Sequence, residues 1–151
     1  MIRVTNCILI NNESILLLKK PRRGWYAFPG GKMEQGETVQ EAVIREFKEE
    51  TGLKIFMPKL TGVFTFLVKE SKKVVKEWIM FTFLAHSFDG QIVEHSEEGE
   101  LEWIPLEDVK NLPMAKGDYK IFDSAIHAKS IVYGAFTYTA DEVLIDWRLN
   151  P

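Results

Sequence analysis

Three glutamates stand close together in the stretch REFKEETGL, residues 45–53. On a helix, the spacing i, i+3 and i+4 puts Glu46, Glu49 and Glu50 on one face, where like charges cost roughly 0.2–0.5 kcal/mol per pair. A shared divalent cation removes this repulsion, because hard ions prefer oxygen ligands. Mg²⁺ usually keeps several waters and adds substrate phosphate oxygens, so an incomplete acidic cage suits it. The spacing therefore favours a magnesium site that takes a phosphate over the alternative, a solvated acidic helix.

A glycine loop lies just upstream of this acidic face. In the run Pro29-Gly30-Gly31-Lys32, the glycines allow the backbone to approach an ion or a phosphate closely, and a carbonyl there can be a further ligand. From Gly31 the sequence reads GKMEQGETVQEAVIREFKEETGL. This stretch resembles the Nudix hydrolase signature at every fixed position, although Phe47 stands where an aliphatic residue is commoner. The fixed positions are Gly31, Glu37, Arg45, Glu46, Glu49, Glu50, Gly52 and Leu53.

The resemblance implies hydrolysis of a nucleoside diphosphate linked to a further group, through attack of water on a phosphorus of the pyrophosphate. Bound Mg²⁺, or Mn²⁺ as the alternative ion, would neutralise charge and acidify that water. Glu46 is a candidate base, and we expect Arg45 to orient Glu37 or Glu49 through a charge-assisted bond. The metal ligands that the resemblance implies on this loop and helix are Gly30, Glu46, Glu49 and Glu50.

A further carboxylate is expected from a loop outside the helix. The stretch EHSEEGELEW offers four, any of which could instead belong to an exposed acidic turn. Counted back from Trp103, Glu98 matches a position that carries a metal-binding or base glutamate in the resembled enzymes. The predicted catalytic set is therefore Glu46, Glu49, Glu98 and Arg45, with Glu98 also a metal ligand. The four carboxylates on offer are Glu94, Glu97, Glu98 and Glu100.

The resemblance extends along nearly the whole chain toward the MutT-like enzymes that remove 8-oxo-dGTP from the nucleotide pool. It rests on WYAFPGGK, LEWIPLEDV, GDYKIF and FTYTADEVLIDW. It implies cleavage of oxidised purine deoxynucleotides to a monophosphate and pyrophosphate. The chain departs from that group where the purine is read, with Ala27, Ala115 and Gly117 in place of base-contacting residues and Asp118 retained. The base preference therefore stays open, as do three other functions: 5′ pyrophosphate removal from RNA, cleavage of another nucleoside diphosphate derivative, and non-catalytic nucleotide sensing.

Aromatic side chains near the loop could stack on a base, although a place in the core explains them equally well. Lys19 could meet a phosphate, against the alternative of a solvated strand end. The predicted substrate-binding residues are Lys19, Trp25, Phe28, Gly31, Lys32, Phe66 and Asp118.

The pattern of apolar residues predicts the elements that position these groups. Thr38 and Glu41 form a capping box, and Gly52 is a stop, so a helix is expected over residues 39–51. A second helix is predicted over 118–130. Strands are predicted at 3–10, 14–19, 61–70, 72–88 and 101–105, with a hairpin at 131–149. We expect an α+β protein with the Nudix fold, in which helices sandwich a mixed sheet as an α/β/α sandwich.

Composition bounds the remaining possibilities. The chain has 151 residues, 46% of them hydrophobic, which suits a single domain. The resemblance implies that this is one Nudix hydrolase domain over residues 1–151. Its net charge of −3 argues against a stable nucleic-acid partner, since phosphate contacts come from Lys and Arg. The single cysteine, Cys7, indicates a reducing compartment, and no apolar run suggests a membrane span. We therefore expect a cytoplasmic protein, monomeric or homodimeric, whose partner is a small nucleotide.

Overall fold

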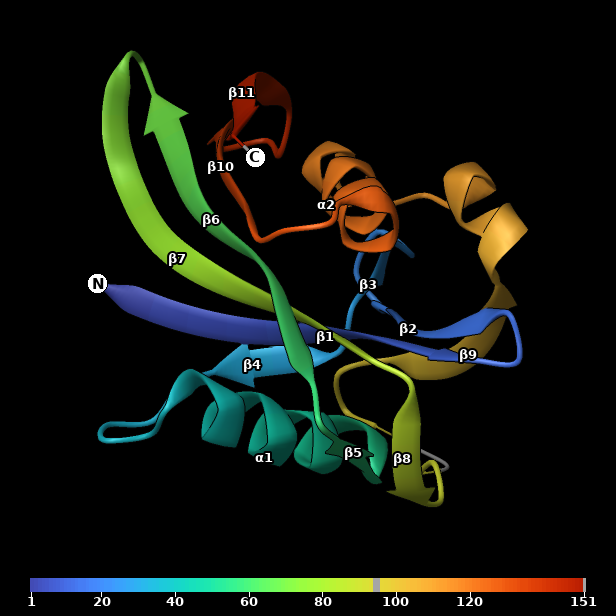
Figure 1. Cartoon of the computed structure of the whole chain (residues 1–151). Helices are drawn as coiled ribbons and strands as arrows, with labels where there is room; N and C mark the ends of the chain where they lie inside the picture. The colour runs from blue at the N-terminus through green and yellow to red at the C-terminus, as the bar shows by residue number, and fades with distance from the viewer. Residues whose placement is uncertain (94–95, 151) are drawn as a thin grey trace.

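Strands cross the middle of the protein and helices lie on either side of them (Figure 1). The computed structural model describes residues 1–93 and 96–150, and the bounds of the elements follow in chain order. They are β1 (Ile2–Asn11), β2 (Ser14–Lys19), β3 (Tyr26–Ala27), β4 (Gly30–Lys32), α1 (Val39–Thr51), β5 (Leu53–Phe56), β6 (Lys59–Glu70), β7 (Lys73–Ala85), β8 (Ser87–Gly90), β9 (Glu100–Pro105), the 3₁₀ helix η1 (Leu106–Asn111), α2 (Lys116–His127), β10 (Val132–Thr139) and β11 (Leu144–Asn150).

The main sheet mixes parallel and antiparallel pairs. Its order is β11-β10-β6-β7-β1-β2-β3, with β4 also paired to β1 and β9 to β2. β1 runs parallel to β7, and β10 runs parallel to β6, while the other neighbours in this sheet are antiparallel. The predicted α+β class with a mixed sheet is confirmed.

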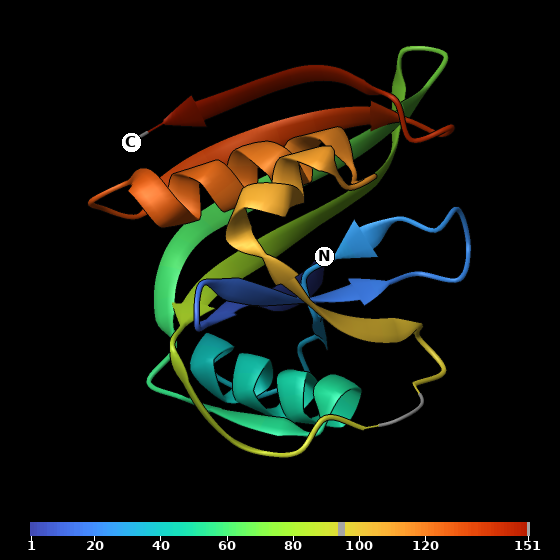
Figure 2. The same ribbon diagram turned by 90° about the vertical axis from the view of Figure 1, so that its right-hand side faces the viewer.

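Two hydrophobic cores lie on opposite sides of β1, because side chains alternate along a strand. Cys7 and Leu9 pack in the α1-side core with Val43 and Phe47 of the helix. Ile8 instead packs in the α2-side core, which contains Ile121 of α2. Figures 1 and 2 show β1 between the two helices, with α1 below it and α2 above it. Packing on both sides of β1 holds in place the glycine loop and α1, which carry the candidate site.

Helix α1 forms where local signals predict it. The Thr38 side chain accepts from the backbone N–H of Glu41, and the Glu41 side chain accepts from the backbone N–H of Thr38. Gly52 ends the helix with φ of 86°, a conformation that favours glycine. Phe47 and Val43 are fully buried, and the acidic side chains lie to one side of this buried stripe.

Three details of the fold differ from the sequence-based expectation. The second helix covers 116–127, not 118–130, because Gly117 in its first turn fits against the ring of Phe136 and donates its N–H to the Tyr138 hydroxyl at 2.8 Å. The expected long strand 72–88 ends at Ala85, and a new strand, β8, pairs with the unpredicted β5. Two further short strands were not predicted: β3 lies just before the glycine loop and β4 lies within it.

Cys7 is fully buried, and this burial raises the pKa of its thiol. Within the described ranges 1–93 and 96–150, we find no helix that combines the length and the apolar character needed to cross a bilayer.

Candidate active site

The acidic face of α1 lines a cavity with the loop that precedes β9. This acidic cavity has a volume of about 330 Å³. Its lining includes five carboxylates, and among them the structure brings the three box glutamates together with Glu98, the loop residue chosen from the sequence. Of the alternatives to Glu98, Glu97 also lines the cavity, Glu100 does not, and Glu94 lies outside the described residues. The lining residues are Glu46, Glu49, Glu50, Val93, Ser96, Glu97 and Glu98.

Arg45 joins the carboxylates of the helix and the preceding loop. Its Nε and Nη2 atoms donate to both oxygens of Glu37, at 2.7 and 2.9 Å, in a bidentate pair. Its Nη1 atom donates to Glu46 at 2.9 Å and to Glu49 at 3.1 Å. Nη2 also donates to the backbone carbonyl of Lys32 at 3.1 Å, which ties the helix to β4. One guanidinium thus sets the positions of three glutamates, a role that suits its rigid, planar donors.

The pair with Arg45 makes the charge of Glu37 part of the folding energy. Hydrogen bonds from the Arg45 guanidinium and from the Glu34 backbone lower the pKa of Glu37 from 4.5 to about 2. A carboxylate with a lowered pKa stabilises the fold above its ordinary pKa, and this contribution is lost as the pH falls through the lowered value.

We therefore expect the difference in Tm between wild type and Glu37→Gln to be largest near neutral pH and to shrink between pH 4.5 and about 2. Thermal unfolding followed by circular dichroism at a series of pH values measures it. Glu70→Gln makes the same chemical change at the exposed tip between β6 and β7 and serves as the control. A Glu37→Gln difference that is constant over the same range would contradict the assignment.

The glycine loop fits closely around two of the glutamates. A Cβ atom on Gly31 would lie 2.1 Å from Oε2 of Glu46, so only glycine leaves room for this carboxylate. The backbone N–H of Gly30 donates to Glu50 at 3.2 Å. Burial raises the pKa of Glu50 to about 7, and the charges of Glu98 and Glu46 act in the same direction. The N–H of Gly30 and the ammonium of Lys20 oppose that rise.

The glutamates that line the acidic cavity suit a hard divalent cation, because such ions prefer oxygen ligands and several carboxylates surround this one cavity. Among residues 1–93 and 96–150, no three His, Cys, Asp or Glu side chains already converge as a ligand group. Arg45 donates hydrogen bonds to Glu46 and Glu49, and the Gly30 N–H donates one to Glu50. The side chains of Glu49 and Glu98 are 59% and 62% exposed, so their rotation toward an ion meets no packing.

A second, larger hollow adjoins the glycine loop. This apolar pocket has a volume of about 820 Å³. Its walls include Phe66 and Trp78, whose rings stack at 5.1 Å with an interplanar angle of 5°. Five predicted substrate-binding residues line it: Trp25, Phe28, Gly31, Phe66 and Asp118.

Asp118 lies in the first turn of α2, and burial raises the pKa of its carboxyl to about 7. The three positions that depart from the resembled enzymes lie near it. Ala27 and Ala115 line the pocket, whereas Gly117 lies against Phe136 and Tyr138. Small side chains at Ala27 and Ala115 leave this wall open to a ligand.

Two predicted residues, Lys19 and Lys32, lie outside the lining of the apolar pocket. Lys19 has its ammonium 6.0 Å from the centre of the Tyr26 ring, and Lys32 has an exposed side chain. The next lysine, Lys20, lines the pocket instead, and its ammonium is 4.0 Å from a carboxylate oxygen of Glu98.

Several lining residues were missed by sequence reasoning: Asn6, Lys76, Trp78, Met80 and Tyr138. Strand pairing brings Trp78 opposite Phe66. A prediction of the register between β6 and β7 could have identified Trp78 from the sequence.

Comparison with known proteins agrees with this architecture. A family model described as the NUDIX domain matches residues 1–125. The uncharacterized Nudix hydrolase YvcI of Bacillus subtilis is 52% identical over 149 residues, covering 99% of this chain and 94% of that protein. An ADP-ribose pyrophosphatase of Methanocaldococcus jannaschii is 35% identical, covering 75% and 65% of the two chains. The crystal structure of a mutator MutT protein from Bacillus halodurans superposes with a TM-score of 0.97 at 46% identity, over 100% of this chain and 99% of that one. The chain therefore belongs to the Nudix family and is a hydrolase of phosphoanhydride bonds.

Proposed function

We propose that this protein cleaves nucleoside triphosphates to a monophosphate and pyrophosphate, with oxidised purine deoxynucleotides such as 8-oxo-dGTP as its main substrates. One observation carries the proposal: the acidic cavity and the apolar pocket meet at the glycine loop. Gly31 lines the apolar pocket and is in contact with Glu46 of the acidic cavity. Lys20 lines the pocket and approaches Glu98 of the cavity. A nucleoside held in the pocket would thus extend its phosphates toward the carboxylates.

In this proposal, the Gly30 carbonyl and the carboxylates of the acidic cavity hold Mg²⁺, or Mn²⁺ in its place. The ion supplies charge neutralisation for the phosphates and lowers the pKa of a bound water. Arg45 keeps Glu46 and Glu49 in position through the bonds described above. Either Glu46 or Glu98 removes the proton from the attacking water. The proposed ligands are Gly30, Glu46, Glu49, Glu50 and Glu98.

The substrate assignment draws on the chain-wide resemblance to 8-oxo-dGTP-hydrolysing enzymes and on the pocket. The stacked rings of Phe66 and Trp78 offer an apolar surface to a base. Asp118, in α2, offers a polar group that lines the same pocket. Lys20 at the junction suits a phosphate better than Lys19, because Lys20 lines the pocket and Lys19 does not.

A panel of nucleotides with identification of the products tests the proposal. We expect kcat/KM for 8-oxo-dGTP to exceed that for dGTP by at least about tenfold, a difference that one or two base contacts can supply. Liquid chromatography should detect monophosphate and pyrophosphate, with no orthophosphate as the first product. Equal, low rates for the two nucleotides would contradict the assignment of oxidised nucleotides as the main substrates. Release of orthophosphate as the first product would contradict cleavage to a monophosphate and pyrophosphate.

A second candidate is cleavage of a nucleoside diphosphate linked to another group, because a relative at 35% identity is an ADP-ribose pyrophosphatase. A higher kcat/KM for ADP-ribose than for any triphosphate in the same panel would favour it.

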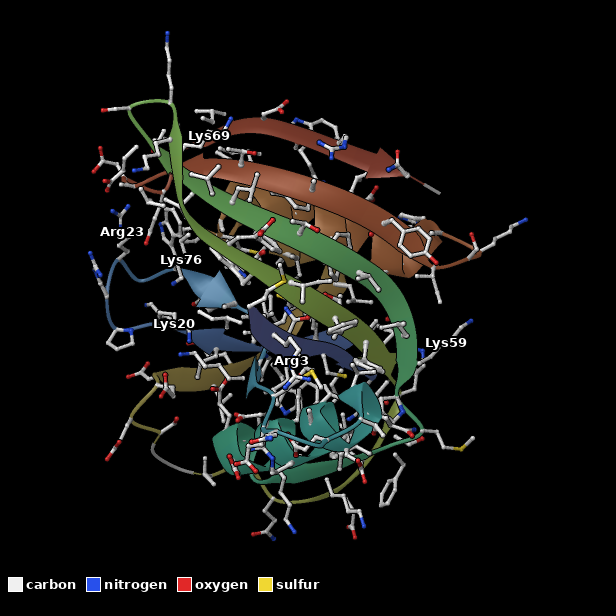
Figure 3. All side chains as sticks on the ribbon, turned by 90° about the vertical axis from the view of Figure 1, so that its left-hand side faces the viewer. Arg3, Lys20, Arg23, Lys59, Lys69 and Lys76 are labelled. Carbon is white, nitrogen blue, oxygen red and sulfur yellow. The ribbon has the colours of Figure 1, made fainter. Side chains whose placement is uncertain are left out.

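The third candidate, 5′ pyrophosphate removal from RNA, is favoured by basic residues on one side of the molecule. Figure 3 shows Lys20, Arg23 and Lys76 there, and Lys20 and Lys76 line the apolar pocket. Arg23 is paired with Glu142 at 3.1 Å, which reduces the charge available to a polyanion. Triphosphorylated RNA therefore belongs in the panel.

A further inference from the structure

Asn6 occupies an unusual position in the middle of β1. Its neighbours Cys7 and Leu9 face the α1-side core, whereas Val4 and Ile8 face the α2-side core. Because side chains alternate along a strand, Asn6 faces the α2 side, where it lines the apolar pocket. The residue is only 7% exposed. A polar amide thus lies at the floor of a pocket whose walls are mostly apolar.

Only one end of this amide is satisfied within the protein. Nδ2 donates to the sulfur of Met80 at 3.2 Å, and Oδ1 has no hydrogen-bond partner in the described part of the chain. A thioether accepts hydrogen bonds but cannot donate them, so the NH₂ group must face Met80 and Oδ1 must be the spare acceptor. A buried acceptor without a partner is unfavourable for folding, and native proteins retain few of them.

The position allows the spare acceptor to meet a ligand. β1 is paired with β4 at Gly30 and with β7 at Thr82, so the backbone of Asn6 is fixed beside the glycine loop. The terminal torsion of an asparagine side chain is broad, and the sulfur of Met80 is a weak acceptor, so the amide can turn toward the pocket at low cost. In apolar ligand pockets, a few polar groups of this kind set orientation and specificity.

We propose that Asn6 reads the nucleobase, with its Oδ1 accepting a hydrogen bond from an N–H group on the edge of the base. The inference rests on the proposed function, in which the apolar pocket takes the nucleoside. It assigns to Asn6 a role in specificity and none in the cleavage step. Bases with a ring or exocyclic N–H, such as guanine and hypoxanthine, are the ligands that this acceptor recognises, and unsubstituted purine lacks the required donor.

Equilibrium binding of nucleoside monophosphates tests this role without requiring turnover. Asn6→Leu has a similar shape and no acceptor. We expect it to weaken binding of GMP and IMP about tenfold, the value of one neutral hydrogen bond, and to leave binding of purine riboside monophosphate unchanged. Isothermal titration calorimetry gives the dissociation constants. Thermal unfolding of the same variant should show an equal or higher Tm, because the substitution removes an unpaired buried acceptor.

Thr82→Val is the matched control. Thr82 pairs with Asn6 across β1 and β7, is fully buried, and also has a side-chain oxygen without a partner in the described residues, but it does not line the pocket. Its substitution should change no dissociation constant.

Equal binding of GMP by wild type and Asn6→Leu overturns the inference, as does wild-type binding of purine riboside monophosphate as tightly as GMP. An Asn6→Leu variant that binds all three ligands more weakly by the same factor also overturns it, since that pattern indicates a distorted pocket. If the proposed function is wrong, triphosphates will not yield a monophosphate and pyrophosphate. That outcome is measured separately and does not change how the dissociation constants of wild type and Asn6→Leu are compared.

Discussion

Glu49→Gln is expected to lower kcat by at least about 10²-fold at saturating Mg²⁺ while leaving the fold intact. The substitution keeps the shape of the side chain and removes the charge that, in the proposed site, balances the divalent ion. Glu49 is 59% exposed and makes one ion pair with Arg45 at 3.1 Å, so its loss should change the free energy of unfolding by less than about 0.5 kcal/mol. Release of pyrophosphate as a function of Mg²⁺ concentration measures the first effect, and urea unfolding measures the second.

Glu41→Gln makes the same chemical change on the same helix and serves as the control. Glu41 belongs to the capping box, in which glutamine can replace glutamate, and it lies outside the acidic cavity. The kcat of the Glu41→Gln variant should stay within about twofold of wild type. If Glu49→Gln were as active as Glu41→Gln, the acidic face of α1 would have no part in the chemistry. If both lost activity together with stability, the loss would belong to the helix and not to the site.

Local signals explain why α1 and its surroundings were predictable from the sequence. The capping box at Thr38 and Glu41, the stop at Gly52 and the apolar stripe all act within one helix, and each is observed in the structure. The acidic face follows directly from that helix. Strands β1 and β2 were predictable because each contains a short apolar run and the polar turn NNE separates the two runs.

Contacts between distant segments were not predictable to the same degree. Trp78 reaches the apolar pocket only because β6 and β7 pair in a register that sets it opposite Phe66. Lys20 was not among the predicted substrate-binding residues, because β2 ends at Lys19 and the strand pattern does not decide which way the next side chain points. The role inferred for Asn6 depends on the sulfur of Met80, 74 residues away in the chain.

Phe47→Ala is expected to lower the free energy of unfolding by about 3–5 kcal/mol. Phe47 is fully buried in the α1-side core, between the sheet and the helix that carries the three glutamates. Removal of its ring leaves a cavity that the packed strands around it cannot close. A loss of this size is a large part of the roughly 5–15 kcal/mol that stabilises a typical domain. Urea unfolding monitored by circular dichroism gives the value.

Two further variants separate the cavity from other effects of losing an aromatic ring. Phe47→Leu replaces the ring with a large aliphatic side chain, the commoner type at this position of the resembled signature, and should cost about 1–2 kcal/mol. Phe56→Ala removes a ring from β5 that is 40% exposed and contacts Lys54, so its cost should be about 1 kcal/mol or less. Equal losses for Phe47→Ala and Phe56→Ala would mean that α1 is held by something other than this core. In that case the acidic face would owe its position to the Arg45 bonds alone, and Arg45→Gln would then unfold the helix.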